Sequence, residues 1–151
     1  MNWWEKAPHR LGQEVTLMEQ KFPQFQLGHS KSNRVINNMI TLRKDQKYWL
    51  GKLRTISGKI YKVLLTYPEY YPGSEIKAYI LNPKITHRQH RYHDGHLCLY
   101  SNDHGGRGQG TGPAMTAISF VGWVAAWLHG HEIYEETGIW PDNSFFNRTR
   151  A

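Results

Sequence analysis

The segment 87–100 holds the residues of this chain that could do chemistry, because it combines the only cysteine with four histidines and two arginines. The cysteine, Cys98, lies between two leucines, and a lone free cysteine is most often a small buried hydrophobic residue. A thiol close to cationic groups ionises more readily, however, and the thiolate is the nucleophilic form. We therefore take Cys98 as the candidate nucleophile, with simple burial as the competing interpretation.

Histidines recur at every third position before this cysteine, as His87, His90, His93 and His96. Such a repeat suggests a zinc site, with Cys98 as a further ligand. A spacing of three aligns side chains only along a continuous helix or 3₁₀ turn, and Asp94-Gly95 interrupts both, so we predict no metal. The other interpretation is that one histidine acts as a general base for Cys98. The candidate catalytic residues are Cys98, His90, His93, Asp94 and His96.

Hydrophobic periodicity predicts the elements that position this segment. Apolar residues spaced by four, three and four predict a helix over 9–22, with Glu14 on its solvent side. Four strand-like runs follow, and their connections are too short for crossover helices, which predicts an antiparallel meander. These runs span 35–43, 48–54, 60–67 and 75–81.

Periodicity is absent over 83–113, which includes the glycine-rich part 105–112, and we interpret this stretch as a long active-site loop. A helix that is apolar on nearly every side follows Thr116, covers 117–129 and extends to Thr137 if Gly138 is its C-cap. The predicted fold class is α+β, with an N-terminal helix, a four-stranded antiparallel meander, the long loop and C-terminal helices.

Length, composition and net charge indicate the class of protein to which the chain belongs. With 151 residues, 39% of them hydrophobic and 21% charged, the chain is expected to form one globular domain, with a core over about 9–140 and a polar, basic tail over 142–151. There is no apolar run of ~20 residues to span a membrane and no secretory signal, so we expect a cytoplasmic protein. The net charge of +7 comes from dispersed basic residues, so nucleic-acid binding is not favoured.

Several motifs make the chain resemble the ubiquitin-conjugating enzyme family over roughly 9–140. Two Tyr-Pro pairs, at 67–68 and 71–72, precede the loop, and Gly95-His96-Leu97-Cys98-Leu99 is similar to the family's Gly-x-Ile-Cys-Leu. Residues 93–100 and the stretch 127–141 are similar to a bacterial branch of the family. Members of that branch occur in antiphage operons of the CBASS type, which use cyclic-oligonucleotide signalling.

The resemblance implies an enzyme in which Cys98 accepts the C-terminus of a protein as a thioester and transfers it to an amine. The implied donor is a cGAS/DncV-like nucleotidyltransferase, and no cofactor is implied. The family's His-Pro-Asn motif is absent, and His90 occupies the position of its asparagine, eight residues before Cys98. We therefore predict that His90 replaces that residue as the donor to the oxyanion.

Two questions stay open from the sequence. The chain has no P-loop and is too short for an adenylation domain, so the thioester comes either from a ubiquitin-activating-like enzyme or from direct attack of Cys98 on an amide bond, as in a transpeptidase. The competing function is a non-catalytic binding module with the same fold, and a metal- or nucleic-acid-binding protein is the third hypothesis.

Overall fold

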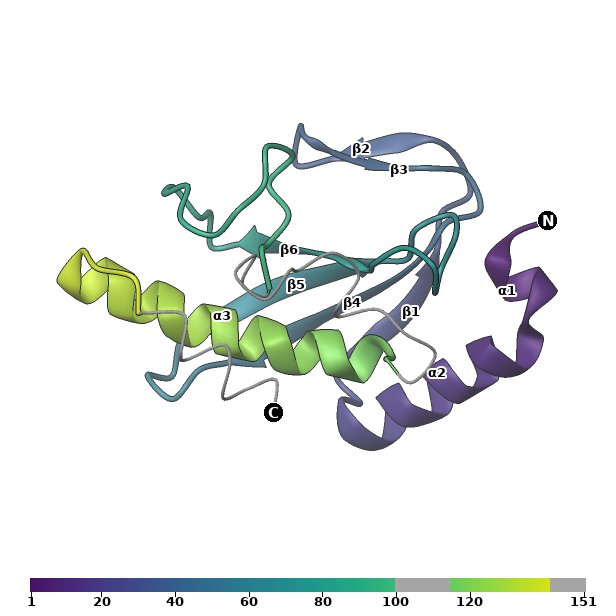
Figure 1. Ribbon diagram of the computed structural model, residues 1–151, viewed down its shortest axis with the longest axis horizontal. Helices are drawn as coiled ribbons and strands as arrows, with labels where there is room; N and C mark the ends of the chain where they lie inside the picture. The colour runs from purple at the N-terminus through teal and green to yellow at the C-terminus, as the bar shows by residue number, and fades with distance from the viewer. Residues whose placement is uncertain (100–114, 142–151) are drawn as a thin grey trace.

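A computed structural model describes residues 1–99 and 115–141, and the elements within these ranges confirm the predicted α+β class (Figure 1). The predicted glycine-rich stretch 105–112 and the basic tail 142–151 lie outside the described residues. The helices are α1 (Trp3–Lys6), α2 (Pro8–Lys21) and α3 (Ala117–Thr137). The strands are β1 (Gln26–His29), β2 (Arg34–Ile36), β3 (Ile40–Leu42), β4 (Lys47–Arg54), β5 (Ile60–Thr66) and β6 (Lys77–Asn82).

Four strands form the main sheet in the order β1-β4-β5-β6, with every pair antiparallel, so the predicted four-stranded meander is confirmed. The prediction for its first strand is wrong, because the run 35–43 lies in a separate hairpin of β2 and β3. That hairpin turns at Asn37 and Asn38, whose φ angles of 52° and 64° fit a type I′ turn and exclude a continuous strand. The true first strand, β1, is four residues long and lacks an alternating pattern.

Both faces of the main sheet are covered by other elements, and the segment before Cys98 lies along its free edge. Val63 and Leu65 of β5 pack in the main core with residues of α3, whereas Leu64 packs against Ile40 of the hairpin. The helix α3 therefore lies along one face of the sheet and the β2–β3 hairpin lies on the other side (Figure 1). Strand β6 is at the edge of the sheet, next to the segment 83–99.

The helices begin and end close to the predicted positions. Helix α2 starts at Pro8, and α3 has Thr116 as its N-cap and Gly138, with a φ of 77°, as its C-cap. Glycine suits this left-handed C-cap because it has no Cβ. None of the helices in the described part of the chain is long and apolar enough to cross a membrane.

Glu14 corrects the prediction for α2, because its side chain is fully buried instead of solvent-exposed. Its carboxylate accepts hydrogen bonds from the hydroxyls of Tyr67 (2.6 Å) and Tyr71 (2.7 Å) and from the main-chain N–H of Ala117 (2.9 Å). A buried carboxylate of this kind is tolerated because it is fully hydrogen-bonded. Glu14 thus joins α2 to the start of α3 and to the segment after β5.

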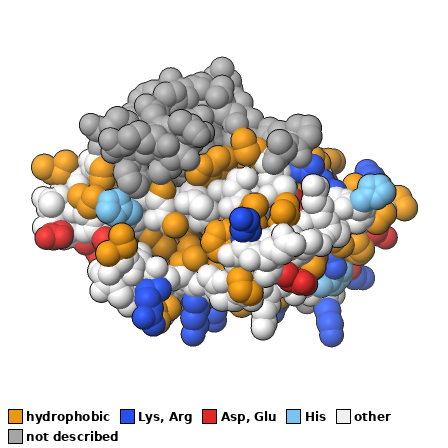
Figure 2. All heavy atoms as spheres, turned by 90° about the horizontal axis from the view of Figure 1, so that it is seen from below, with side chains coloured by type: hydrophobic (Ala, Val, Ile, Leu, Met, Phe, Trp, Pro, Cys, Tyr) orange, Lys and Arg blue, Asp and Glu red, His pale blue; other side chains and the backbone are white. Residues whose placement is uncertain are grey.

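Charged and apolar side chains are distributed differently over the α3 side of the molecule. Figure 2 shows Lys and Arg side chains standing mainly towards the edges of this face and hydrophobic side chains over its middle. This agrees with the dispersed basic residues of the sequence.

Candidate active site

Cys98 is held by main-chain hydrogen bonds on both sides. Its own N–H donates to the carbonyl of His90 (2.8 Å), and the preceding N–H of Leu97 donates to the carbonyl of Ala78 in β6 (2.9 Å). The side chains of Leu97 and Leu99 are buried, whereas Cys98 between them is half-buried. The expected simple burial of this cysteine is therefore incomplete, and the thiol sits on a segment fixed to the edge of the sheet.

A tight turn brings residues 91–97 back on themselves. Arg91 and Leu97 form an antiparallel bridge, and the N–H of Tyr92 donates to the carbonyl of His96 (2.9 Å). Gly95 has a φ of 89°, a conformation that other residues rarely adopt. This requirement explains why a glycine stands three residues before the cysteine.

The side chain of Tyr92 is hydrogen-bonded to Cys98, and Tyr92 was not among the predicted site residues. Burial, together with its hydrogen bond to Cys98, raises the pKa of Tyr92 to about 12. The phenol is therefore protonated at neutral pH and donates its O–H towards the sulfur. No spacing rule singles out this tyrosine, because the contact depends on the turn at 92–95.

Asp94 and His96 form the second group of the site. The His96 Nδ1 lies against an Asp94 carboxylate oxygen, which also accepts the N–H of His96 (3.0 Å), and Lys77 contacts the other oxygen (3.1 Å). Burial works against the ionised form of Asp94, but the hydrogen bonds from His96 and Lys77 outweigh it, so the pKa of Asp94 lies well below its usual range. The carboxylate accepts the Nδ1 proton, which leaves Nε2 of a neutral His96 as the basic nitrogen.

Two features of His96 suit a general base. Burial lowers the pKa of His96 below its usual value, with Asp94 partly opposing this shift, so the ring is neutral at neutral pH. Its ring stacks on the ring of Tyr92 with a centroid separation of 4.2 Å. The structure thus brings Asp94 and His96 to the same tyrosine that contacts the thiol.

His90 is also brought to Cys98, through its main chain. Its carbonyl accepts both the N–H of Cys98 and the indole N–H of Trp127 (2.9 Å), and its φ of 51° turns the chain at this point. The imidazole stacks on Trp140 at 4.7 Å between centroids, and burial lowers the pKa of His90.

His93 differs from the other candidates, because the structure does not bring it to them. Its side chain is exposed, and the hydrogen bonds, ion pairs and ring contacts found among residues 1–99 and 115–141 do not include it. The regular spacing of the four histidines therefore does not translate into a common site. Within those same ranges, no group of three or more His, Cys, Asp or Glu side chains is arranged to hold a metal ion.

A histidine pair behind the site was missed from the sequence. His87 Nδ1 accepts the N–H of Gln89 (3.1 Å), so its Nε2 carries the proton and donates to Nδ1 of His131 (2.8 Å). The remaining nitrogen of His131, Nε2, then faces Glu135 (3.4 Å). His131 comes from α3, forty-four residues from His87, and no local pattern predicts that the two meet.

Trp127 connects this pair to the segment of Cys98. Its ring stacks on His131 (5.5 Å between centroids) and on His87 (6.0 Å), while its indole N–H holds the His90 carbonyl. The apolar helix α3 therefore supports the main chain on which the cysteine is fixed.

Comparison with known proteins identifies the family. The sequence model of the type II CBASS E2 proteins matches residues 14–145, which include Cys98, the sheet strands β1, β4, β5 and β6, and α3. No curated protein matches the chain. Because the match spans most of the sequence, the chain belongs to the family of type II CBASS E2 proteins, E2-like conjugating transferases of bacterial antiviral defence.

Proposed function

We propose that this protein is an acyl carrier in which Cys98 forms a thioester with the C-terminus of a protein and passes the acyl group to an amine. The observation that carries the proposal is the arrangement around the half-buried thiol, where the Tyr92 hydroxyl contacts Cys98 and the ring of His96, bound by Asp94, stacks on the ring of Tyr92. A non-catalytic binding module has no need of a base oriented by a carboxylate next to a cysteine.

Each residue has a distinct part in the proposed reaction. His96, oriented by Asp94, takes the proton of the thiol and later that of the attacking amine, because its pKa is lowered and its Nε2 is basic. The Tyr92 O–H stabilises negative charge on the sulfur before attack. Attack on a carbonyl also places negative charge on oxygen, and we assign the donor at that position to His90, which stands where the related enzymes have asparagine.

The proposed donor is a cGAS/DncV-like nucleotidyltransferase of the same defence system, since the family places the chain among CBASS proteins. Two routes to the thioester are chemically complete. Either a ubiquitin-activating-like enzyme hands over an acyl group that it has already activated, or the thiolate of Cys98 attacks an amide bond directly and releases the amine. The second route needs a general base at the thiol, and His96 supplies one.

Intact-mass spectrometry under non-reducing conditions tests the proposal. The full chain is incubated with the nucleotidyltransferase encoded beside it, with and without ATP and an activating enzyme. We expect a thiol-labile adduct on the wild type, none on Cys98→Ala and a stable ester on Cys98→Ser. ATP dependence of the adduct distinguishes the two routes. Absence of any adduct while the two proteins still bind would contradict the proposal and leave the binding module.

A further inference from the structure

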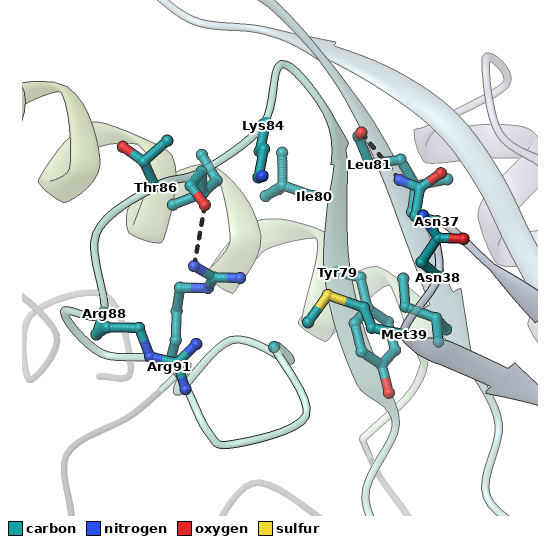
Figure 3. A pocket seen from close by; sticks show the side chains of 13 residues that line it. Asn37, Asn38, Met39, Tyr79, Ile80, Leu81, Lys84, Thr86, Arg88 and Arg91 are labelled. Carbon is teal, nitrogen blue, oxygen red and sulfur yellow. Dashed lines mark hydrogen bonds between the residues drawn. The ribbon is translucent and has the colours of Figure 1, made fainter.

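A cavity of about 560 Å³ lies between the β2–β3 hairpin, strand β6 and the segment that leads to Cys98. Figure 3 shows Asn37, Asn38 and Met39 of the hairpin on one side and Thr86, Arg88 and Arg91 on the other, with Tyr79 to Leu81 of β6 between them. The hairpin is fastened over β6, because the side-chain amide of Asn37 donates to the carbonyl of Leu81 (3.2 Å). The pocket is therefore bounded by fixed elements on each side.

The charged groups of this pocket are all positive. Lys84, Arg88 and Arg91 line it, and no aspartate or glutamate is among its described lining residues. Arg91 is held in place, since its guanidinium donates to the carbonyl of Ile85 (3.1 Å; Figure 3) and to the carbonyl of His87 (2.8 Å). Lys84 and Arg88 are exposed and reach the pocket from the outside. Three cations to which residues 1–99 and 115–141 offer no acidic partner favour an anionic ligand.

The edge of β6 gives the pocket a second property. Ala78 accepts the N–H of Leu97 on the side of β6 that faces away from β5. Because main-chain groups alternate between the two sides of a strand, the N–H and C=O of Ile80 point to the same outer side, where the pocket lies. An exposed strand edge of this kind pairs with an extended peptide, which supplies the matching donors and acceptors.

The remaining walls of the pocket are largely apolar. Met39 is 48% exposed at the rim, and Ile40 and Tyr79 line the pocket from the hairpin and β6. A pocket that joins a strand edge, apolar side chains and cations matches a peptide with a carboxylate at its end. A phosphate group alone would use only the cations.

The pocket also lies close to the candidate nucleophile along the chain. Leu97, the neighbour of Cys98, is paired with Ala78, and Ile80 is two residues further along β6, which corresponds to roughly 7 Å. Gly95 and Arg91 of the turn before Cys98 line the same pocket. If a peptide lies along β6 with one of its carbonyl groups at Cys98, its C-terminus reaches the cations of the pocket one or two residues later.

We propose that this pocket binds the free C-terminal carboxylate of the donor protein, with Arg88 and Lys84 contacting the carboxylate and the main chain of the peptide lying along β6. The inference rests on the proposed function and selects its direct route. The thiolate of Cys98 attacks the carbonyl carbon of an amide bond near the C-terminus, the C–S bond forms and the C–N bond breaks. The leaving amine belongs to the fragment whose C-terminal carboxylate the pocket binds. It takes the proton that His96 received from the thiol, and the fragment then dissociates from the pocket.

A peptide array tests the recognition without requiring any reaction. Octapeptides attached through their N-termini are presented in pairs, one with a free C-terminal carboxylate and one with a C-terminal amide, and are probed with the full chain carrying Cys98→Ala. We expect binding to be at least about tenfold stronger for the free carboxylate. We expect Lys84→Gln combined with Arg88→Gln to remove this preference.

A matched control keeps the change in net charge the same. Lys52→Gln combined with Lys62→Gln removes two exposed cations that face each other on β4 and β5, outside the pocket, and should leave the preference intact. Equal binding of acid and amide peptides, no binding of either, or equal losses in both double variants would overturn the inference. Release of the peptides by pyrophosphate at far lower concentration than by N-acetylalanine would also overturn it, in favour of a phosphate ligand.

The two proposals fail in distinguishable ways. If the donor forms an adduct on Cys98 equally well in wild type and in the Lys84/Arg88 variant, and the acid preference is absent, the pocket assignment is wrong and the acyl carrier remains. If the acid preference is present and depends on Lys84 and Arg88 but no donor ever forms an adduct, the acyl carrier is wrong and the pocket remains a carboxylate site.

Discussion

The carboxylate of Asp94 contacts both His96 and Lys77, and these contacts fix the orientation of the His96 ring. Its carboxylate accepts from the main chain and the ring of His96 and pairs with Lys77. Both contacts favour the ionised carboxylate, and the contact with the ring of His96 also favours one tautomer of the imidazole. His96 is therefore arranged as a general base oriented by a carboxylate, unlike an isolated surface histidine.

Asp94→Asn should act through His96 without touching the thiol. The amide no longer stabilises the charged imidazole, so the pKa of His96 falls further, and the rate of adduct formation should drop by about 10²-fold on the plateau. In the wild type the rate should fall as the pH decreases through a value below 6.5, because the base must be neutral, and this acid limb should move to lower pH in Asp94→Asn. The pH profile of adduct formation measures both effects.

His93→Gln is the control for this prediction, since His93 is exposed and does not contact the pair. It should keep the wild-type rate and pH profile. A loss in His93→Gln as large as in Asp94→Asn would contradict the assignment of the base to His96.

The sequence shows part of this site and hides the rest. A single short motif, residues 94–98, contains Asp94, Gly95, His96 and Cys98, so these residues can be identified from the sequence. Tyr92 reaches the sulfur only through the turn at 92–95, and His131 meets His87 only because α3 packs beside the loop. Contacts set by packing between distant elements leave no local pattern.

Helix α3 supports the site through a close approach to Trp140. A Cβ at Gly130 would lie 2.7 Å from the indole of Trp140, whose ring stacks on His90. The small residue in the helix therefore allows Trp140 to lie against it and to reach the residue that holds the N–H of Cys98.

Gly130→Ala should lower stability and activity together. The added methyl group displaces Trp140, and overpacking of this kind costs roughly 1–3 kcal/mol in the free energy of unfolding. We also expect slower adduct formation, because His90 loses its stacking partner. Urea denaturation and intact-mass kinetics measure the two effects.

Gly122→Ala is the matched variant in the same helix. Beyond the helix's own backbone and the two chain neighbours, no atom of the described residues lies within 4 Å of a Cβ at that position. Gly122 is also exposed, so the better helix propensity of alanine should stabilise the protein by roughly 0.5–1 kcal/mol. Equal behaviour of the two variants would exclude a special role for the contact between Gly130 and Trp140.

The elements themselves could be predicted to different extents. The bounds of α3 follow from Thr116, Gly138 and a long apolar run, and the structure agrees with them. Strand β1 escapes prediction because Gln26–His29 is stabilised by pairing with β4 more than by its own residues. Glu14 is misplaced for a related reason, since its two tyrosine partners come from a segment fifty residues away or more.

At the scale of the whole molecule, burial of histidines links stability to pH. Burial lowers the pKa of His87, His90, His96 and His131 in the folded protein below the usual 6.5. The unfolded chain therefore binds more protons than the folded chain below about pH 6.5, and protonation favours unfolding. The lowered pKa values of Asp94 and Glu132 act only at lower pH, where their stabilising contributions are lost as the carboxylates protonate.

We expect the free energy of unfolding to be nearly constant between about pH 7 and 9 and to fall as the pH decreases from about 6.5 to 5, by up to about 1.4 kcal/mol per pH unit for each extra proton bound. His131→Gln should reduce this slope, whatever it does to stability at pH 8. Urea denaturation at several pH values gives the slope, and an unchanged slope in His131→Gln would contradict the prediction.

The stacking of Trp127 on His131 has an optical consequence. A protonated imidazole quenches the fluorescence of an adjacent indole more strongly than a neutral one, so protonation of this pair changes the emission of a tryptophan that also holds the main chain of His90. Trp140 lies on His90 itself. The protein thus carries built-in fluorophores whose emission follows the charge states of His131 and His90, without any attached label.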